Sequence, residues 1–277
     1  MFKIENPLKQ WHETHKIEED GVTYFLKHYE PASYEIRNEI NWLTSIMIKS
    51  CSSFKTPEVK EASIDEGYIK MNYIDIIDNP DKEKIVDYLT ECAVELHSLI
   101  KSDEPHLRTK ITKNDYIPYL EDFAQQRVDL INKDFLISPD VSEWINKQVK
   151  ELKVKYFSVV HRDLRCRHLL FSDSEKPTLV DWEFSNISEP AQDLAKLIYD
   201  SVVNHEMKRD FIFDKVIDHY ATERKISKEE LEKKVLTFLP IIPLEHCASF
   251  VTRKPDGYEK EVLKDLAFIT TLYDEKK

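Results

Sequence analysis

Residues 161–168 read HRDLRCRH, and residues 179–184 read LVDWEF. Asp163 is followed five positions later by His168, and Asp181 stands thirteen residues beyond that histidine. Short apolar runs surround these residues, FSVVH before the first motif and HLLF and TLVDW after it, and they predict short strands. The two carboxylates and the histidine would then lie at strand ends, which makes them the first candidates for a functional site.

The composition limits what kind of protein can carry this site. The chain has 277 residues, of which 41% are apolar and 11% aromatic, enough for one large domain or two smaller lobes with a packed core. A net charge of −12 argues against non-specific nucleic-acid binding, which needs a surplus of Lys and Arg. The four cysteines lie far apart without a CxxC pair, which argues against a disulfide scaffold and a zinc site.

The small number of glycines and the lack of long apolar runs exclude further classes of protein. Only three glycines occur, too few for a P-loop, a dinucleotide-binding GxGxxG or the glycine-rich loop of a protein kinase. No run of about 18 apolar residues is present, and MFKIENPLKQ at the start has no apolar core of a signal peptide. We therefore expect a cytoplasmic protein with no membrane span.

Periodicity predicts two lobes of different character. Residues 22–29 (VTYFLKHY) alternate as a strand after an EDG turn, and the preceding WHETHKI could be the hairpin partner. Helical spacing of apolar residues follows in 32–49 and again in 82–100. The expected fold class is α+β, with a β-rich N-lobe (1–74) containing one helix and a larger, mainly helical C-lobe (75–277), joined near residues 72–75.

This arrangement, with HRDLRCRH and LVDW in the larger lobe, resembles the protein-kinase-like superfamily, and within it the aminoglycoside phosphotransferase and choline kinase group of small-molecule kinases. The resemblance covers about residues 20–200. It implies that Asp163 accepts the proton of the substrate hydroxyl and that His168 and Asp181 hold the metal ions. His161 belongs to the same catalytic loop, where structural hydrogen bonding is favoured over base chemistry. Asp193, in the DLA motif after Pro190, is expected to brace the loop as structural support.

The same resemblance implies a nucleotide site for ATP or GTP with Mg²⁺, or alternatively Mn²⁺. Lys27 is the candidate strand lysine that grips the phosphates. Its partner could be Glu35 or Glu39, and Glu39 is favoured because it lies only about 60° from Ile36 around the helix, against about 100° for Glu35. The nucleotide base is expected to dock on the connector formed by Met71, Asn72, Tyr73 and Ile74. Without glycines, Lys9, His12 or His15 would have to cover the phosphates.

His168 departs from the commoner asparagine of this position. Magnesium prefers oxygen ligands, so a catalytically dead nucleotide-binding pseudokinase is one alternative. Some antibiotic kinases of the family, however, also carry histidine there, and the loop is expected to remain active. Since only neutral imidazole coordinates a metal, activity should fall as pH drops through about 6.5, the ordinary pKa of histidine.

The acceptor is expected to be a small molecule with a hydroxyl group: an antibiotic, an amino sugar, a choline-like compound or a related metabolite. Only residues 182–189 separate Asp181 from Pro190, too few for the peptide-docking segment of a protein kinase. A glycan or lipopolysaccharide-type sugar kinase, or a protein kinase, is the other alternative. Glu183 would suit an amine, as would Glu189 and Asp200, whereas Arg165 and Arg167 would suit an anionic group. His97 is expected at the edge of the core.

Overall fold

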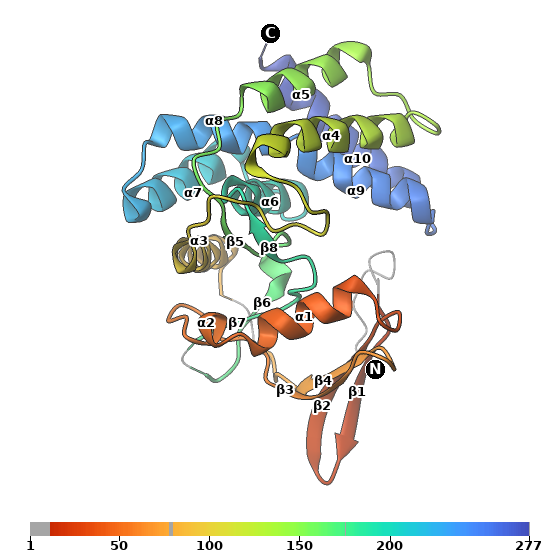
Figure 1. Ribbon diagram of the computed structural model, residues 1–277, viewed down its shortest axis with the longest axis vertical. Coiled ribbons are helices and arrows are strands. Elements are labelled where there is room, and N and C mark those ends of the chain that lie inside the picture. Colours follow the sequence, from red (N-terminus) through yellow and green to blue (C-terminus); the bar gives the residue numbers. More distant parts are fainter. Residues whose placement is uncertain (1–11, 78–79, 175, 277) are drawn as a thin grey trace.

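The computed structural model describes residues 12–77, 80–174 and 176–276, and these form a small lobe of strands and a larger helical lobe (Figure 1). Within this part of the chain the predicted α+β architecture with two lobes is confirmed. The small lobe contains β1 Thr14–Glu19, β2 Val22–His28, α1 Tyr34–Thr44, α2 Ile46–Lys49, β3 Val59–Ser63 and β4 Tyr68–Asn72.

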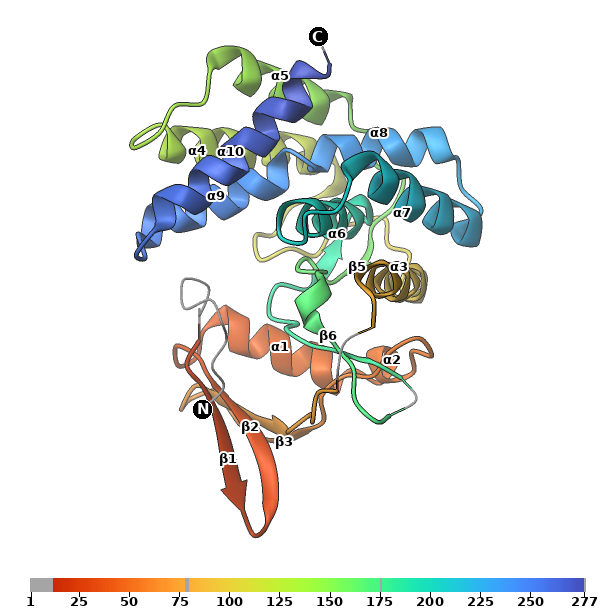
Figure 2. The ribbon, with the colours of Figure 1, turned by 180° about the vertical axis from the view of Figure 1, so that it is seen from behind.

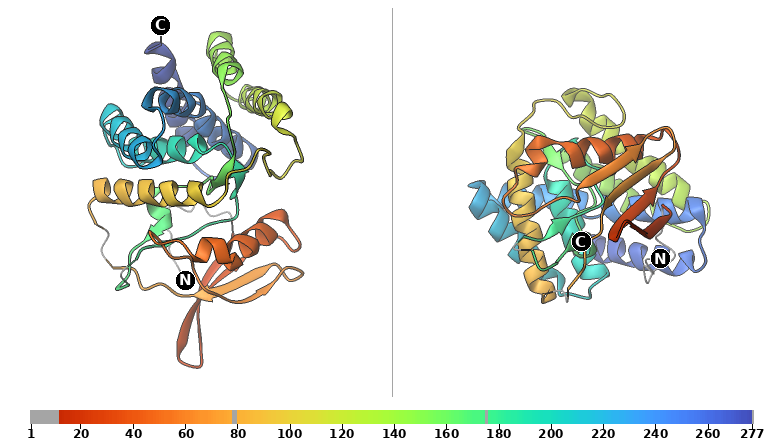
Figure 3. Two further views of the ribbon diagram at one scale, coloured as in Figure 1. Left: turned by 60° about the vertical axis from the view of Figure 1, so that its left-hand side comes forward. Right: turned by 90° about the horizontal axis from the view of Figure 1, so that it is seen from below.

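The sheet of the small lobe is antiparallel, in the order β1-β2-β4-β3. Asp20 and Gly21 alone connect β1 to β2, and both have positive φ angles, 52° and 78°. Two residues of this conformation form the tight turn that fits the twist of a hairpin. The hairpin projects away from the helical lobe (Figure 3), so its turn does not resemble a glycine-rich loop.

Two elements of the small lobe go beyond the sequence prediction. The helical pattern over 32–49 divides into α1 and the four-residue α2, so the lobe has a second, short helix. Strand β3 was not predicted, because its sequence VKEAS is polar and three of its five residues are exposed. Its pairing with β4 gives it the strand conformation.

Helix α1 connects the small lobe to the segment that follows Asp181. Ser33 caps the helix by accepting a hydrogen bond from the Ile36 N–H at 3.5 Å, and Glu39 is among the buried residues of the inner face. On another face, the Asn38 side-chain amide donates to the backbone carbonyls of Glu183 and Ser185, both at 2.8 Å. These contacts fix Glu39 relative to the larger lobe.

The larger lobe surrounds one central helix, α6, which is buried over residues 191–201 (Figures 1 and 2). Short strands near α6 carry the sequence motifs. The elements of this lobe are α3 Lys82–Leu99, α4 Tyr116–Ile131, α5 Pro139–Glu151, β5 Ser158–Val160, β6 Leu169–Leu170, β7 Thr178–Leu179, β8 Asn186–Ser188, α6 Ala191–Val203, α7 Arg209–Arg224, α8 Lys228–Phe238, α9 Ile241–Arg253 and α10 Tyr258–Asp274, with short 3₁₀ turns at Lys113–Asp115 and Cys166–His168.

His97 on α3 is fully buried, and its expected place at the core edge is wrong. Its Nε2 lies 3.1 Å from an Asp193 carboxylate oxygen and its Nδ1 lies 2.8 Å from the Tyr220 hydroxyl. The two hydrogen bonds offset the free-energy cost of burying the imidazole ring.

Among the described residues, one window, Lys228–Arg253, is long and apolar enough to cross a membrane by length and composition alone. It comprises α8 and α9, and most of it is buried inside the lobe, as for core helices.

The predicted boundary between the two lobes, at residues 74 and 75, stays a prediction. Strand β4 ends at Asn72, and α3 begins at Lys82.

Candidate active site

The predicted catalytic loop, residues 161–168, follows β5, and Asp193 on α6 holds it in place. Arg162 in this loop has φ 69°, a left-handed conformation that costs free energy for a residue with a side chain. The buried Asp193 carboxylate accepts hydrogen bonds from the backbone N–H groups of His161 and Arg162, both at 2.7 Å. These two bonds offset the strain and fix the loop ahead of Asp163.

His161 supports the loop through its buried ring. Its Nε2–H donates to the Val180 carbonyl at 3.0 Å, and the ring packs edge-on against Trp182 at 4.8 Å between centroids. Burial lowers the pKa of His161, despite the neighbouring carboxylates of Asp193 and Asp163. A neutral ring bonded to the strand that leads to Asp181 favours structural support over base chemistry.

Asp163 is buried between two cations. Its Oδ1 accepts a hydrogen bond from Arg165 Nε at 2.6 Å and lies 3.1 Å from Lys196 Nζ. Burial alone would raise the pKa of Asp163, but Arg165 and Lys196 together hold it well below its usual range. Oδ2 lies 3.5 Å from His168 Nδ1, farther than Oδ1 lies from Arg165 or Lys196. Oδ2 is therefore the oxygen with room for a further hydrogen-bond donor.

Lys196 was missed by the sequence prediction. It stands on α6 three residues after Asp193 and four before Asp200, so the three side chains lie on one face of the helix. All three contact the catalytic loop, since Asp200 accepts a hydrogen bond from the Cys166 N–H at 3.0 Å. The sequence signal was this spacing of charged residues on an otherwise apolar helix.

His168 is oriented by the backbone of Asp163. Its Nδ1–H donates to the Asp163 carbonyl at 2.8 Å, which leaves the lone pair on Nε2. Nε2 lies 3.3 Å from Asp181 Oδ2 and accepts a hydrogen bond from Arg167 Nε at 3.0 Å. A tautomer fixed in this way is the usual arrangement of a metal-binding histidine.

The structure lowers the pH at which His168 is expected to become protonated. Burial lowers its pKa to about 4, although Asp163 and Asp181 oppose the shift. An imidazole with this pKa is neutral, and able to bind a metal, at all pH values above about 4. A decline of activity near pH 6.5 is therefore not expected from His168.

On the other side of Asp181, three carboxylates surround one ammonium group. Lys27 Nζ donates to Asp181 at 2.7 Å and to Glu39 and Glu183, both at 2.9 Å. Burial opposes a charged lysine, but the three carboxylates raise the pKa of Lys27 well above its usual value. Burial also raises the pKa of Glu39 to about 7, against the opposing effect of Lys27. His12 Nε2 lies 2.8 Å from Glu183 and adds a second basic group.

Asp181 thus belongs to two clusters whose composition fits divalent cations. The atoms of Asp163, His168 and Asp181 that could bind a metal lie within 4.8 Å of one another, and so do those of Glu39, Asp181 and Glu183. The first cluster offers two carboxylates and an imidazole and the second offers three carboxylates, and carboxylate oxygens are the ligands that Mg²⁺ prefers. The left-handed backbone of Asp181, φ 72°, places its carboxylate between the two clusters.

A cavity of about 360 Å³ opens beside these clusters, between the lobes. Its lining includes the predicted phosphate lysine, Lys27, the predicted partner Glu39 and the predicted connector 71–74. Apolar side chains that could pack against a flat ring also line it. The lining includes Lys27, Glu39, Met71, Asn72, Tyr73, Ile74, Arg167, His168, Asp181 and Glu183, with Phe25, Pro57, Leu170 and Val180.

Several predicted residues take other places. Glu35 pairs with Arg108 at 2.9 Å, on the surface, and not with Lys27. Arg165 binds the Asp163 carboxylate itself. His15 lies 3.0 Å from Glu13 and does not line the cavity, whereas His12 does. Lys9 lies outside the described residues.

The acidic residues that were candidates for binding an amine acceptor instead bind other residues of the protein. Glu183 binds Lys27, Glu189 is buried with Lys234 at 3.4 Å, and Asp200 accepts the Cys166 N–H. Burial raises the pKa of Glu189 to about 7.

The sequence matches a family with this chemistry. The model of the phosphotransferase enzyme family, APH, matches residues 12–214. The chain belongs to this phosphotransferase family. The match spans both lobes and includes Lys27, Asp163, His168 and Asp181. No curated protein sequence matches the chain significantly.

Solved structures share the fold of this chain at low sequence identity, and they confirm the predicted protein-kinase-like fold class. A protein from Haemophilus somnus 129PT assigned as a fructosamine-3-kinase has a TM-score of 0.67 and 16% identity, covering 95% of this chain and 88% of its own. Choline kinase LicA from Streptococcus pneumoniae has a TM-score of 0.67 and 16% identity, with 93% and 89% covered. Aminoglycoside phosphotransferase APH(4)-Ia, in a ternary complex with ADP and hygromycin B, has a TM-score of 0.64 and 12% identity, with 94% and 92% covered.

Proposed function

We propose that this phosphotransferase moves the γ-phosphoryl group of ATP or GTP, in the presence of Mg²⁺, to a hydroxyl group of a small molecule. One observation carries the proposal: Asp163, His168 and Asp181 form a continuous set of contacts beside a cavity that Lys27 and Glu39 also line. This grouping supports the proposal, because phosphoryl transfer needs a base for the acceptor and ligands for the phosphates within one site. A cytoplasmic location is part of the same proposal.

The nucleotide would occupy the cavity between the lobes. Its base would pack between the apolar side chains and bind the connector Met71–Ile74, and its phosphates would meet Lys27. Structures of the same fold bind ADP in APH(4)-Ia and GDP in aminoglycoside 2′-phosphotransferase-IIIa. Magnesium, when bound at Asp181 and His168, supplies charge neutralisation at the phosphates.

Arg167 is better placed for the phosphates than for the acceptor. Its side chain lines the nucleotide cavity and donates to His168 Nε2, the atom that a metal would need. Release of this hydrogen bond would free the guanidinium group to bind phosphate oxygens. Arg167 thus compensates in part for the missing glycine-rich loop.

Asp163 would serve the acceptor through Oδ2. The acceptor oxygen forms a bond to the γ-phosphorus while the bond from phosphorus to the bridging oxygen breaks, and the hydroxyl proton passes to Asp163. Because Arg165 and Lys196 lower the basicity of this carboxylate, its main contribution is to orient the hydroxyl and to take the proton late. The nucleoside diphosphate leaves with the broken bond.

The segment after Asp181 favours a small acceptor. Strand β8 pairs with β5 directly after this segment, so the chain returns to the core within a few residues. Arg162, which could order a longer segment, binds Gln192 at 2.6 Å and Glu245 at 3.1 Å. Neither feature provides a surface for a peptide substrate.

The test is a nucleotide-consumption screen over amines, sugars, antibiotics and nucleosides, run with ATP and with GTP. We expect at least one hydroxyl compound to accelerate nucleotide consumption by wild-type protein and not by Asp163→Asn. Binding of nucleotide without acceleration by any acceptor class would favour the pseudokinase alternative.

Replacement of Lys27 should affect both binding and turnover. In Lys27→Ala, Glu39, Asp181 and Glu183 lose their shared counter-charge, and we expect a higher KM for nucleotide, a lower kcat and a loss of stability of about 3–5 kcal/mol. Mg²⁺ should raise the unfolding temperature of this variant more than that of wild type, because it can replace the missing charge.

Lys60→Ala is the matched control, since Lys60 is an exposed lysine of the same sheet. Its kinetic constants should equal those of wild type. Unchanged KM and kcat in Lys27→Ala would exclude Lys27 as a phosphate ligand.

Replacement of His168 tests the metal site. We expect His168→Ala to lose about 10- to 1000-fold in rate, because Nε2 would be a direct metal ligand. His168→Asn supplies an oxygen ligand at the same position and should remain active, and Mn²⁺ should support wild type well.

A pH series adds an independent measurement. The wild-type rate should show no His168-dependent decline between pH 7 and about pH 5, since the pKa of this group is lowered to about 4. A His168→Ala variant as active as wild type at saturating metal would show that Asp181 holds the metal without this histidine.

A further inference from the structure

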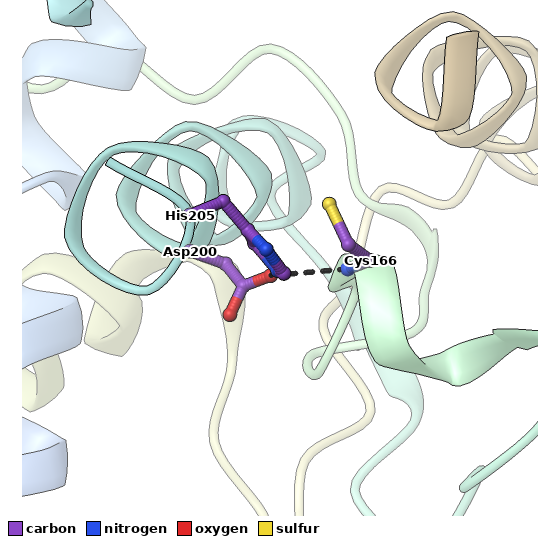
Figure 4. A group of neighbouring side chains, drawn as sticks. All are labelled: Cys166, Asp200 and His205. Atoms are coloured by element: carbon purple, nitrogen blue, oxygen red, sulfur yellow. Dashed lines mark hydrogen bonds and ion pairs between the residues drawn. The ribbon is translucent and has the colours of Figure 1, made fainter. Parts of the chain in front are cut away.

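A second group of metal-binding side chains lies behind the catalytic loop, outside the nucleotide cavity. Cys166 stands in the 3₁₀ turn between Asp163 and His168, Asp200 on the last turns of α6, and His205 just after that helix (Figure 4). The Cys166 thiol, an Asp200 carboxylate oxygen and a His205 ring nitrogen lie within 4.8 Å of one another. Residues far apart in the sequence thus converge, which the spacing of the cysteines could not indicate.

The group is held in position by its own hydrogen bonds. Asp200 Oδ2 accepts the Cys166 N–H at 3.0 Å and lies 3.5 Å from His205 Nε2. Asp200 Oδ1 accepts a hydrogen bond from the Asn204 side-chain amide at 2.7 Å. Cys166 and Asp200 are buried, whereas the His205 side chain is 26% exposed. The histidine side is therefore the route by which an ion could enter.

We propose that Cys166, Asp200 and His205 bind a zinc-like divalent cation, separate from the magnesium of the phosphotransfer site. A thiolate, a carboxylate and an imidazole are ligands that Zn²⁺ accepts together, with a water molecule in the fourth position. On binding, the Cys166 thiol releases its proton to solvent and the sulfur bonds to the ion. Two negative ligands and one neutral ligand then balance the double positive charge, which suits a largely buried site.

The ion would join the catalytic loop to the end of α6. Cys166 lies three residues after Asp163 and two before His168, so a bond at its sulfur restrains the backbone that positions both. Asp193 already ties the start of the loop to the other end of the same helix. The two attachments together would hold the loop along the length of α6.

Cobalt titration of the full-length, reduced protein tests the site, because a thiolate bound to Co²⁺ gives a charge-transfer absorption that oxygen and nitrogen ligands do not. We expect one equivalent of Co²⁺ to produce this absorption and Zn²⁺ to abolish it by displacement. Cys166→Ser should lack the absorption, and His205→Ala should weaken Co²⁺ binding at least about tenfold. Because the His205 side chain is only partly buried, its replacement is compatible with folding.

Two matched controls and one separating variant complete the experiment. Cys51→Ser and His219→Ala, in other parts of the fold, should titrate as wild type does. His168→Ala should keep the absorption, which separates this site from the phosphotransfer metals. No charge-transfer absorption in wild type, its persistence in Cys166→Ser, or unchanged affinity in His205→Ala would each overturn the proposal.

Discussion

An Asp163→Asn variant is expected to lose about 10²- to 10⁴-fold in phosphoryl transfer while nucleotide affinity changes by less than about threefold. The carboxylate lies beside His168 but does not line the proposed nucleotide cavity, so we expect its charge to serve the acceptor hydroxyl and not the nucleotide. The amide keeps the shape of the side chain, and the backbone carbonyl that orients His168 is unchanged. Steady-state rates and calorimetric nucleotide titration measure the two effects separately.

Asp173→Asn, on the exposed loop between β6 and β7, is the matched control and should retain full activity. Thermal unfolding of both variants detects any general damage, since Arg165 and Lys196 lose their shared counter-ion in Asp163→Asn. More than about a tenth of wild-type turnover in a folded Asp163→Asn would remove this residue from the base role.

The second large effect is expected from Asp181→Asn. Asp181 is common to both cation clusters, so its neutralisation should lower the affinity for nucleotide in the presence of Mg²⁺ by at least about 100-fold. Asparagine tolerates the left-handed backbone at this position, φ 72°, better than most residues, which makes the substitution mild for the fold. Nucleotide titrations with Mg²⁺ and with a chelator give the metal-dependent part of the binding.

In wild type, the chelator should weaken nucleotide binding strongly, and in Asp181→Asn it should change little. Asp65→Asn, an exposed aspartate of the turn between β3 and β4, should bind like wild type. Equal Mg²⁺-dependent affinity in wild type and Asp181→Asn would mean that the metals do not bind here.

Local patterns in the sequence were sufficient to predict much of the site. The phase of one helix favoured Glu39 over Glu35, and the structure places Glu39 against Lys27 and Glu35 against Arg108. The family resemblance of the two motifs assigned Asp163, His168 and Asp181 to one site, and in the structure His168 lies between the two carboxylates. These relations depend on helix geometry and on short strands, both of which can be read from neighbouring residues.

The rest depends on contacts between distant segments. Lys196 reaches Asp163 only because α6 packs under the catalytic loop, and Glu183 meets Lys27 only because α1 docks on the segment after Asp181. Strand β3 is polar and takes its conformation from pairing with β4. The pKa of His168 likewise depends on burial by the assembled lobes, which no local pattern measures.

The most direct measurement of the central claim is transfer of labelled γ-phosphate from nucleotide to a protein-free pool of small hydroxyl compounds, with wild type and Asp163→Asn compared at equal nucleotide occupancy. The account predicts a labelled low-molecular-weight phosphate ester that wild type forms in the presence of Mg²⁺ and that Asp163→Asn does not form. Label in an ester at equal rates with both proteins, or no labelled ester from wild type that binds Mg²⁺-nucleotide, would contradict it.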